Sequence, residues 1–150
     1  MRNYLKNRVL RLAWSLMWEN RLLAFLARMK AASFKAEYFP NAEGLSINPN
    51  SVVKYPEKIT FGAGCIIGKC TLGGAGGIKF GTGVTVSEGA VIETGTLTRS
   101  GEGRHKAAPI TIGNGVWVCA GAIILGGVSV PDNTTVPAGA VVRRTAEPRG

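Results

Sequence analysis

The sequence has a single histidine, His105, and only three cysteines, Cys65, Cys70 and Cys119, among 150 residues. One histidine excludes a metal centre built from three histidine ligands, and three cysteines form no even disulfide framework. We therefore expect the cysteines to be small core residues in a reducing cytoplasm. A chain of this length forms one ordinary domain, with no room for a nucleotide-binding domain beside a second catalytic one.

The N-terminal segment lacks a hydrophobic run that could cross a bilayer. Its longest uncharged run, residues 12–18, has seven residues, whereas a spanning helix needs about twenty. This segment is also poor in acids: residues 1–40 hold eight Lys and Arg against two Glu, which is two-thirds of the net charge of +9. The excess predicts a solvated helix face, or contact with an anionic membrane surface or a polyanionic partner.

Residues 3–34 contain no Gly or Pro and predict helix, either as one helix or as two that are broken near Glu19 and Asn20. Aliphatic residues recur at helical spacing opposite a narrow polar wedge, namely Leu5, Val9, Leu12 and Leu16. Trp14 and Trp18 widen this apolar surface. Such an amphipathic helix needs burial against the body of the protein, a neighbouring subunit or lipid.

From residue 47 onward the apolar pattern takes a six-residue period, which fits neither a helix nor an alternating strand. Its most regular stretch repeats one aliphatic position at Ile112, Val118, Ile124, Val130, Val136 and Val142. Small or β-branched residues stand four positions after each of the first five, at Val116, Ala122, Val128, Thr134 and Ala140. Upstream, the series starts at Ile47, slips after Ile59 and resumes at Phe61. A fixed period of this kind is typical of a solenoid.

Each hexapeptide then supplies a short strand and one corner of a triangular coil, and three of them close the coil. Gly, Asn and Asp between the aliphatic positions suit corners with positive φ. Residues 47–142 predict an all-β solenoid of about five coils stacked by parallel pairing. We divide the chain into a helical segment, residues 1–40, which could cap one end of the stack, and a repeat domain, residues 41–150.

The period breaks decisively at residues 98–109, a polar stretch with no inward aliphatic series. A long polar excursion from a regular solenoid is usually functional. This loop contains His105.

Three repeat segments resemble the hexapeptide-repeat acyltransferases, which fold as left-handed parallel β-helices. They are residues 109–118 (PITIGNGVWV), 122–128 (AIILGGV) and 136–142 (VPAGAVV). The match covers residues 47–145 and is nearest to small bacterial sugar and polysaccharide O-acetyltransferases, while Gly103-Arg104-His105 resembles the loop of serine acetyltransferases. The resemblance implies a homotrimer with active sites between neighbouring subunits and acetyl-CoA along the groove.

For catalysis, the resemblance implies that His105 is the general base that deprotonates an acceptor hydroxyl. Glu93, Glu88 and Glu102 are candidate carboxylates to orient it. The polysaccharide O-acetyltransferases carry their base near the position of Gly95 or Thr96, and the serine acetyltransferases near that of Gly74, where this sequence has no histidine. A surface histidine and a substrate-binding residue therefore remain alternative interpretations of His105.

For the coenzyme, the resemblance implies backbone contacts from Ala120 and Ala138, one coil apart, to the pantetheine arm. Arg143 and Arg144 stand where the family has a Thr-Lys pair, and two guanidinium groups suit phosphates. Trp117 is expected beside the coenzyme groove, or else as an exposed corner residue that packs on the next coil. No metal is expected.

We therefore predict an acetyl-CoA-dependent O-acetyltransferase that acts on a sugar hydroxyl of a surface polysaccharide or lipid-linked glycan precursor. We expect it in the cytoplasm, with peripheral association to the inner face of the membrane through residues 1–30 as a further expectation. A γ-type carbonic anhydrase is excluded, because it needs three zinc-bound histidines and this chain has one. Nucleic-acid binding is not expected despite a pI near 10.0, because no recognition fold accompanies the charge. The alternative is a catalytically weak or non-enzymatic β-helix scaffold.

Overall fold

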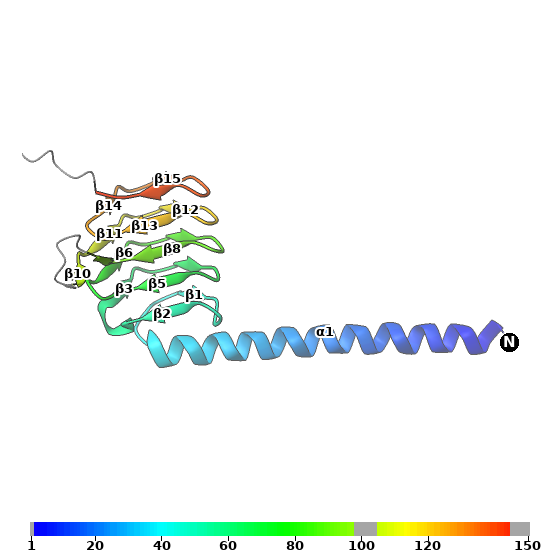
Figure 1. Ribbon diagram of the computed structural model, residues 1–150. Coiled ribbons are helices and arrows are strands. Elements are labelled where there is room, and N and C mark those ends of the chain that lie inside the picture. Colours follow the sequence, from blue (N-terminus) through cyan, green and yellow to red (C-terminus); the bar gives the residue numbers. More distant parts are fainter. Residues whose placement is uncertain (1, 98–104, 145–150) are drawn as a thin grey trace, which may run out of the picture.

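The computed structural model describes residues 2–97 and 105–144, and at residues 2–19, 96, 97 and 105 it describes the backbone alone. Figure 1 shows a stack of β-coils above one long helix. Helix α1 spans Arg2–Tyr38 without the break considered near Glu19 and Asn20. Since this segment contains no Gly or Pro, nothing interrupts the backbone hydrogen bonds of a single helix.

Three parallel sheets form the walls of the solenoid. Sheet A contains, in order, β1 (Ser46–Ile47), β4 (Ile66–Ile67), β7 (Thr85–Val86), β12 (Trp117–Val118) and β15 (Thr135–Val136). Sheet B contains β2 (Val52–Lys54), β5 (Thr71–Gly73), β8 (Val91–Glu93), β13 (Ile123–Leu125) and β16 (Val141–Val142). Sheet C contains β3 (Ile59–Phe61), β6 (Ile78–Phe80), β11 (Ile110–Ile112) and β14 (Ser129–Val130), and a 3-10 turn (Pro56–Lys58) precedes β3. The structure is a left-handed parallel β-helix of about five coils, as the period predicted.

Successive coils are in register, so the inward residues of each wall stack. In sheet A the paired inward residues are Ile47, Ile67, Val86, Val118 and Val136. Paired positions are 18 residues apart between β12 and β15 but 20 apart between β1 and β4. These extra corner residues explain the slip of the period after Ile59. Because of the slip, Leu72 escaped the sequence series, although it lies fully inside. Ile78 is also fully inside, because β6 has two inward residues, Ile78 and Phe80, and the series counted only Phe80.

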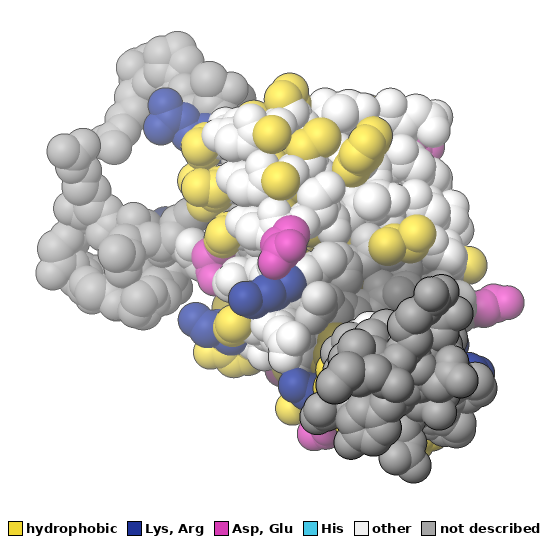
Figure 2. All heavy atoms as spheres, turned by 90° about the vertical axis from the view of Figure 1, so that its right-hand side faces the viewer, with side chains coloured by type: hydrophobic (Ala, Val, Ile, Leu, Met, Phe, Trp, Pro, Cys, Tyr) yellow, Lys and Arg dark blue, Asp and Glu magenta, His cyan; other side chains and the backbone are white. Residues whose placement is uncertain are grey.

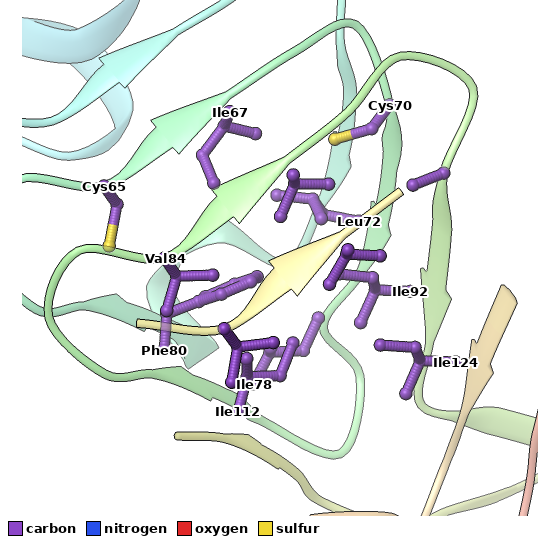
Figure 3. Packing of buried hydrophobic residues seen from close by; sticks show 14 of the residues in the cluster. Cys65, Ile67, Cys70, Leu72, Ile78, Phe80, Val84, Ile92, Ile112 and Ile124 are labelled. Carbon is purple, nitrogen blue, oxygen red and sulfur yellow. The ribbon is translucent and has the colours of Figure 1, made fainter. Parts of the chain in front are cut away.

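The core runs the length of the solenoid between the three walls. Phe80 is the largest fully buried side chain, and Leu72, Ile92, Ile112 and Ile124 are enclosed with it. Figure 3 shows these side chains pointing into the interior from different strands. All three cysteines are free thiols. Cys65 and Cys70 are buried among these side chains, as expected for core cysteines, whereas Cys119 is partly exposed.

One corner of the solenoid is held by a ladder of polar side chains. Asn114 Oδ1 accepts a hydrogen bond from the Thr82 N–H at 2.9 Å, and the Asn114 N–H donates to Asp132 Oδ1 at 2.8 Å. Asn133 beside them has a φ of 56°, a left-handed conformation that asparagine tolerates better than most residues. The Gly, Asn and Asp residues between aliphatic positions therefore form corners, as predicted.

Helix α1 is anchored to the first coil by its C-terminal end. The Phe39 ring meets Phe61 edge to face, with centroids 4.9 Å apart, and Phe61 stacks on Phe80 at 4.6 Å. Lys30 Nζ also donates to Asn50 Oδ1 at 3.0 Å. The rest of the helix extends beyond the body (Figure 1). No helix in the described part of the chain is long and apolar enough to cross a membrane.

Candidate active site

The loop predicted at residues 98–109 belongs to a β-hairpin inserted between β8 and β11. Its strands β9 (Gly95–Leu97) and β10 (His105–Ala107) pair antiparallel, with His105 opposite Leu97. Residues 98–104, which contain the candidate Glu102, lie outside the described residues, as does the side chain of His105. Paired residues of β7 and β12 are 32 positions apart instead of the 18 that separate those of β12 and β15. The third coil thus accommodates the whole hairpin at the corner between sheets B and C, which we call the hairpin edge.

Thr94 forms the foot of the hairpin, a role that the sequence analysis missed. Its side chain is fully buried, and its hydroxyl donates to the Gly73 carbonyl at 2.6 Å and accepts from the Gly76 N–H at 2.9 Å. The Thr94 carbonyl accepts from the Ala108 N–H at 3.0 Å, which ties the outgoing and returning strands together. A buried hydroxyl that is satisfied both as a hydrogen-bond donor and as an acceptor fixes the backbone segments that it joins. No pattern in the sequence distinguishes this threonine from the others.

Glu93 lies beside this foot. Its Oε1 accepts a hydrogen bond at 3.0 Å from the N–H of Gly95, the first residue of β9. The carboxylate lies over Gly73, where a methyl group would collide with it. Of the three candidate carboxylates, Glu93 is therefore the one whose described contacts reach the hairpin.

Glu88 lies on a different corner, between sheets A and B, which we call the alanine edge. Glu88, Ala120 and Ala138 stack there in successive coils: the Gly121 N–H donates to the Glu88 carbonyl at 3.2 Å and the Gly139 N–H donates to the Ala120 carbonyl at 3.0 Å. All three stacked residues are exposed. The N–H groups of Ala120 and Ala138 donate to no other group in the described part of the chain. At Ala120 and Ala138 the alanine edge has small side chains and free backbone donors, which suits an extended, amide-containing ligand.

Trp117 stands on the outer face of sheet A, next to the alanine edge. Its indole is 53% exposed, and Nε1–H donates to Ser87 Oγ at 3.0 Å. The hydrogen bond to the coil below fixes the ring while its face stays open to solvent. The two interpretations from the sequence, a groove residue and an exposed residue packing on the next coil, are both compatible with this position.

Arg143 and Arg144 follow β16 and are exposed. A methyl group on Gly127 would lie 3.6 Å from both Arg144 Cδ and Ala108 Cβ. Arg144 is therefore stacked above the foot of the hairpin, on the hairpin edge. This places positive charge two coils above the strand that carries His105.

Within one chain the predicted site residues divide between two edges. His105, Glu93 and Arg144 belong to the hairpin edge, while Ala120 and Ala138 belong to the alanine edge. Sheet B separates the two. A single subunit thus does not bring the histidine strand and the alanine stack together.

A cavity of about 310 Å³ opens at the other end of the solenoid, between the end of α1 and the first coil. Its walls include Tyr38, Phe39, Ile59 and Phe61. It lies two coils from the hairpin and contains none of the predicted site residues. Within the described residues, no three His, Cys, Asp or Glu side chains are gathered to hold a metal ion.

Solved acyltransferases share this fold at low sequence identity. A maltose O-acetyltransferase from Clostridium difficile 630 superposes with a TM-score of 0.66 and 23% identity, over 89% of this chain and 80% of that one. A variant of AntD, an N-acyltransferase from Bacillus cereus solved with dTDP and coenzyme A, gives a TM-score of 0.52 and 15% identity, over 69% of this chain and 72% of that one. No protein-family profile and no curated protein matches the chain. At these identities the likeness establishes the fold.

Proposed function

We propose that the chain is an acyltransferase that moves the acetyl group of acetyl-CoA to a sugar hydroxyl of a surface polysaccharide or lipid-linked glycan precursor. The hairpin in the third coil is the observation that carries the proposal: a regular solenoid does not need it, and it holds the only histidine. Two similar folds add support, because one is by name a maltose O-acetyltransferase and the other was solved with coenzyme A.

The exterior of the solenoid favours a homotrimer. Sheet B presents a ladder of outward residues that is apolar at four of its five positions: Val52, Thr71, Val91, Ile123 and Val141. The outward residues of sheet C are polar: Thr60, Lys79, Thr111 and Ser129. Figure 2 shows exposed hydrophobic side chains at several heights of the molecule, with charged side chains between some of them. The other outward row of sheet B contains Lys54 and Glu93. Burial of the apolar ladder against another copy is favourable, so we place sheet B toward a threefold axis.

Threefold symmetry with sheet B inward would complete the site. A cyclic trimer is held by heterologous contacts, in which one edge of each subunit meets the other edge of the next. The hairpin edge of one subunit then faces the alanine edge of its neighbour. This arrangement would unite His105 with Ala120 and Ala138, which a single chain keeps apart. A stable monomer in light scattering would contradict it.

In this site the acceptor hydroxyl is activated by proton transfer to the imidazole of His105. The hydroxyl oxygen attacks the thioester carbonyl carbon, and backbone N–H groups stabilise the negative oxygen of the tetrahedral intermediate. Collapse breaks the carbon–sulfur bond, and the departing thiolate takes the proton from the imidazolium. Glu93 would act as a positioning residue through its hydrogen bond to Gly95 at the start of the hairpin.

The alanine edge suits the pantetheine arm of acetyl-CoA. The small side chains of Ala120 and Ala138 let an extended chain approach the backbone, and the free N–H groups of both residues can donate to pantetheine carbonyls. Trp117 would border the groove. Arg143 and Arg144 would bind the coenzyme phosphates by charge-assisted hydrogen bonds.

The decisive test compares His105→Ala and His105→Asn with the wild-type protein. Acetyl-CoA binding is measured by calorimetry, and turnover by acetyl transfer to a panel of sugars and by the slow hydrolysis of acetyl-CoA. Loss of a general base should lower kcat by about 10²- to 10⁴-fold while binding is unchanged. Asparagine keeps a hydrogen-bonding side chain but cannot accept the proton, so both variants should be equally inactive.

Other outcomes distinguish the alternatives. Activity restored by asparagine would make His105 a substrate-binding residue, and full activity of both variants would make it a surface histidine. Failure of the wild-type protein to bind acetyl-CoA at millimolar concentration would overturn the acyltransferase function in favour of a scaffold.

A further inference from the structure

Helix α1 exposes a concentration of large hydrophobic side chains that the proposed acetyl transfer does not use. Five such residues, each more than half exposed, fall between positions 22 and 29: Leu22, Leu23, Phe25, Leu26 and Met29. The remaining large exposed hydrophobic residues of the described chain are spread over the solenoid and Tyr38. An apolar patch of this density on an exposed helix marks a contact surface.

Four of these residues form one stripe. At about 100° of rotation per residue, Leu22, Phe25, Leu26 and Met29 fall within an arc of about 100°. The helix residues that are half-buried against the solenoid, Ala31, Phe34 and Lys35, lie on the opposite side of the helix. The stripe therefore points away from the β-helix, and the described part of the chain does not cover it.

Positive charges border the stripe. By the same rotation, Arg21 and Arg28 lie along one side. Lys30 lies along the other side, where its ammonium group donates to Asn50 of the first coil. The first forty residues hold eight basic residues and only two acids. If two copies of the helix packed through the stripe, the flanking arginines would face like charges with few acids to pair them, which is unfavourable. Anionic lipid headgroups complement this border instead, and long basic side chains can reach them while the stripe is buried.

The direction of the helix fits a membrane surface. Figure 1 shows α1 running across the stacking axis of the coils, below the first coil. If the proposed trimer has its threefold axis along the solenoids, symmetry puts three such helices in one plane at the same end. Their stripes would all face away from the coils. Three coplanar helices could then lie on one membrane together, which increases avidity.

We propose that residues 20–30 of α1 bind in the plane of an anionic lipid surface, with Leu22, Phe25, Leu26 and Met29 inserted among the acyl chains. The solenoid then stands on the membrane with its first coil nearest the lipid. A lipid-linked acceptor would be concentrated in the same layer. The helix docks on the surface, and its apolar side chains enter only the outer part of the bilayer.

Vesicle flotation of the full-length protein tests the proposal. Vesicles of phosphatidylcholine with phosphatidylglycerol are compared with vesicles of phosphatidylcholine alone, at low and high salt. We expect the protein to float with the anionic vesicles and to be released by salt. Phe25→Ser with Met29→Ser should lower the partition coefficient at least tenfold. Leu23→Ser, which removes one leucine outside the arc and beyond Lys30, should have a smaller effect than Leu26→Ser, which removes one leucine within the arc.

Charge is tested by a second matched pair. Arg28→Gln should weaken binding about fivefold, whereas Lys79→Gln, on the outer face of sheet C, should change it less. Absence of flotation at low salt, or equal flotation of wild type and the Phe25/Met29 double variant, would overturn the proposal. So would a drop in oligomeric state of that double variant in solution, because the stripe would then be a subunit contact. Acetyl-CoA binding measured on the same samples reports separately on the proposed enzymatic function.

Discussion

Replacement of Gly73 by alanine tests how the hairpin is positioned. The three atoms nearest to the added methyl group would all belong to the Glu93 carboxylate, and none to the backbone. The side chain of Glu93 can rotate away, but it then loses its hydrogen bond to the Gly95 N–H. We therefore expect Gly73→Ala to leave the solenoid intact and to release the first residue of the hairpin.

Loss of this hydrogen bond should lower both kcat and the free energy of unfolding. A hydrogen bond from an N–H to a carboxylate contributes about 1.5–3 kcal/mol. If the whole of this free energy serves to hold the hairpin in its reactive geometry, loss of the hydrogen bond lowers kcat by about 10- to 150-fold. Stability should fall by about 0.5–2.5 kcal/mol, because the lower conformational entropy of the unfolded alanine chain, about 0.4–1 kcal/mol, offsets only part of the lost hydrogen bond. Glu93→Gln should keep most of the activity, since its amide oxygen can still accept from Gly95.

The measurements are kcat for acetyl transfer or acetyl-CoA hydrolysis and the free energy of unfolding in urea. Gly62→Ala is the matched control on the edge between sheets C and A, away from both functional edges. There the methyl group would lie 2.5–2.6 Å from backbone atoms of Gly81 and Thr82, so it should cost about 1–3 kcal/mol of stability and leave kcat per folded molecule unchanged. A Gly73→Ala protein with wild-type kcat, or Glu93→Gln as inactive as Gly73→Ala, would refute the positioning role of this hydrogen bond.

Three further variants probe the core, a buried thiol and the coenzyme contacts. Phe80→Ala removes a ring that is 2% exposed and stacked on Phe61, and should lower the free energy of unfolding in urea by about 3–5 kcal/mol. Burial raises the pKa of the Cys70 thiol from 9.0 to about 11. Above pH 9 the thiol therefore loses its proton in the unfolded chain before it does so in the folded protein. Relative to Cys70→Ala, wild type should lose about 1–3 kcal/mol of stability as the pH approaches 11. Parallel pH profiles of stability for the two proteins would contradict this. Arg143→Ala combined with Arg144→Ala should raise the Kd for acetyl-CoA at least tenfold in calorimetry while kcat at saturation is kept, and an unchanged Kd would exclude both arginines from phosphate binding.

The sequence by itself determined the architecture, because the six-residue period is repeated in every coil and needs no knowledge of distant contacts. Ile112, Val118 and Ile124 were predicted to point inward, and all three are fully buried. The break at residues 98–109 located the inserted segment in the same way. The prediction was incomplete where the corners are longer. Leu72 was missed, because extra corner residues break the six-residue spacing along the chain while the inward side chains of successive coils still stack.

The tertiary structure decided which residues share an edge. Glu88 and Glu93 are five positions apart in the sequence, and either could have been assigned to His105. Glu88 precedes strand β8 of sheet B and Glu93 is the last residue of that strand, so Glu88 is placed on the alanine edge and Glu93 on the hairpin edge. Thr94 likewise became visible as the foot of the hairpin only through its hydrogen bonds to Gly73 and Gly76. Periodicity is a local property that records which side chains face inward, whereas the pairing of coils and the lengths of their corners determine which exposed groups meet.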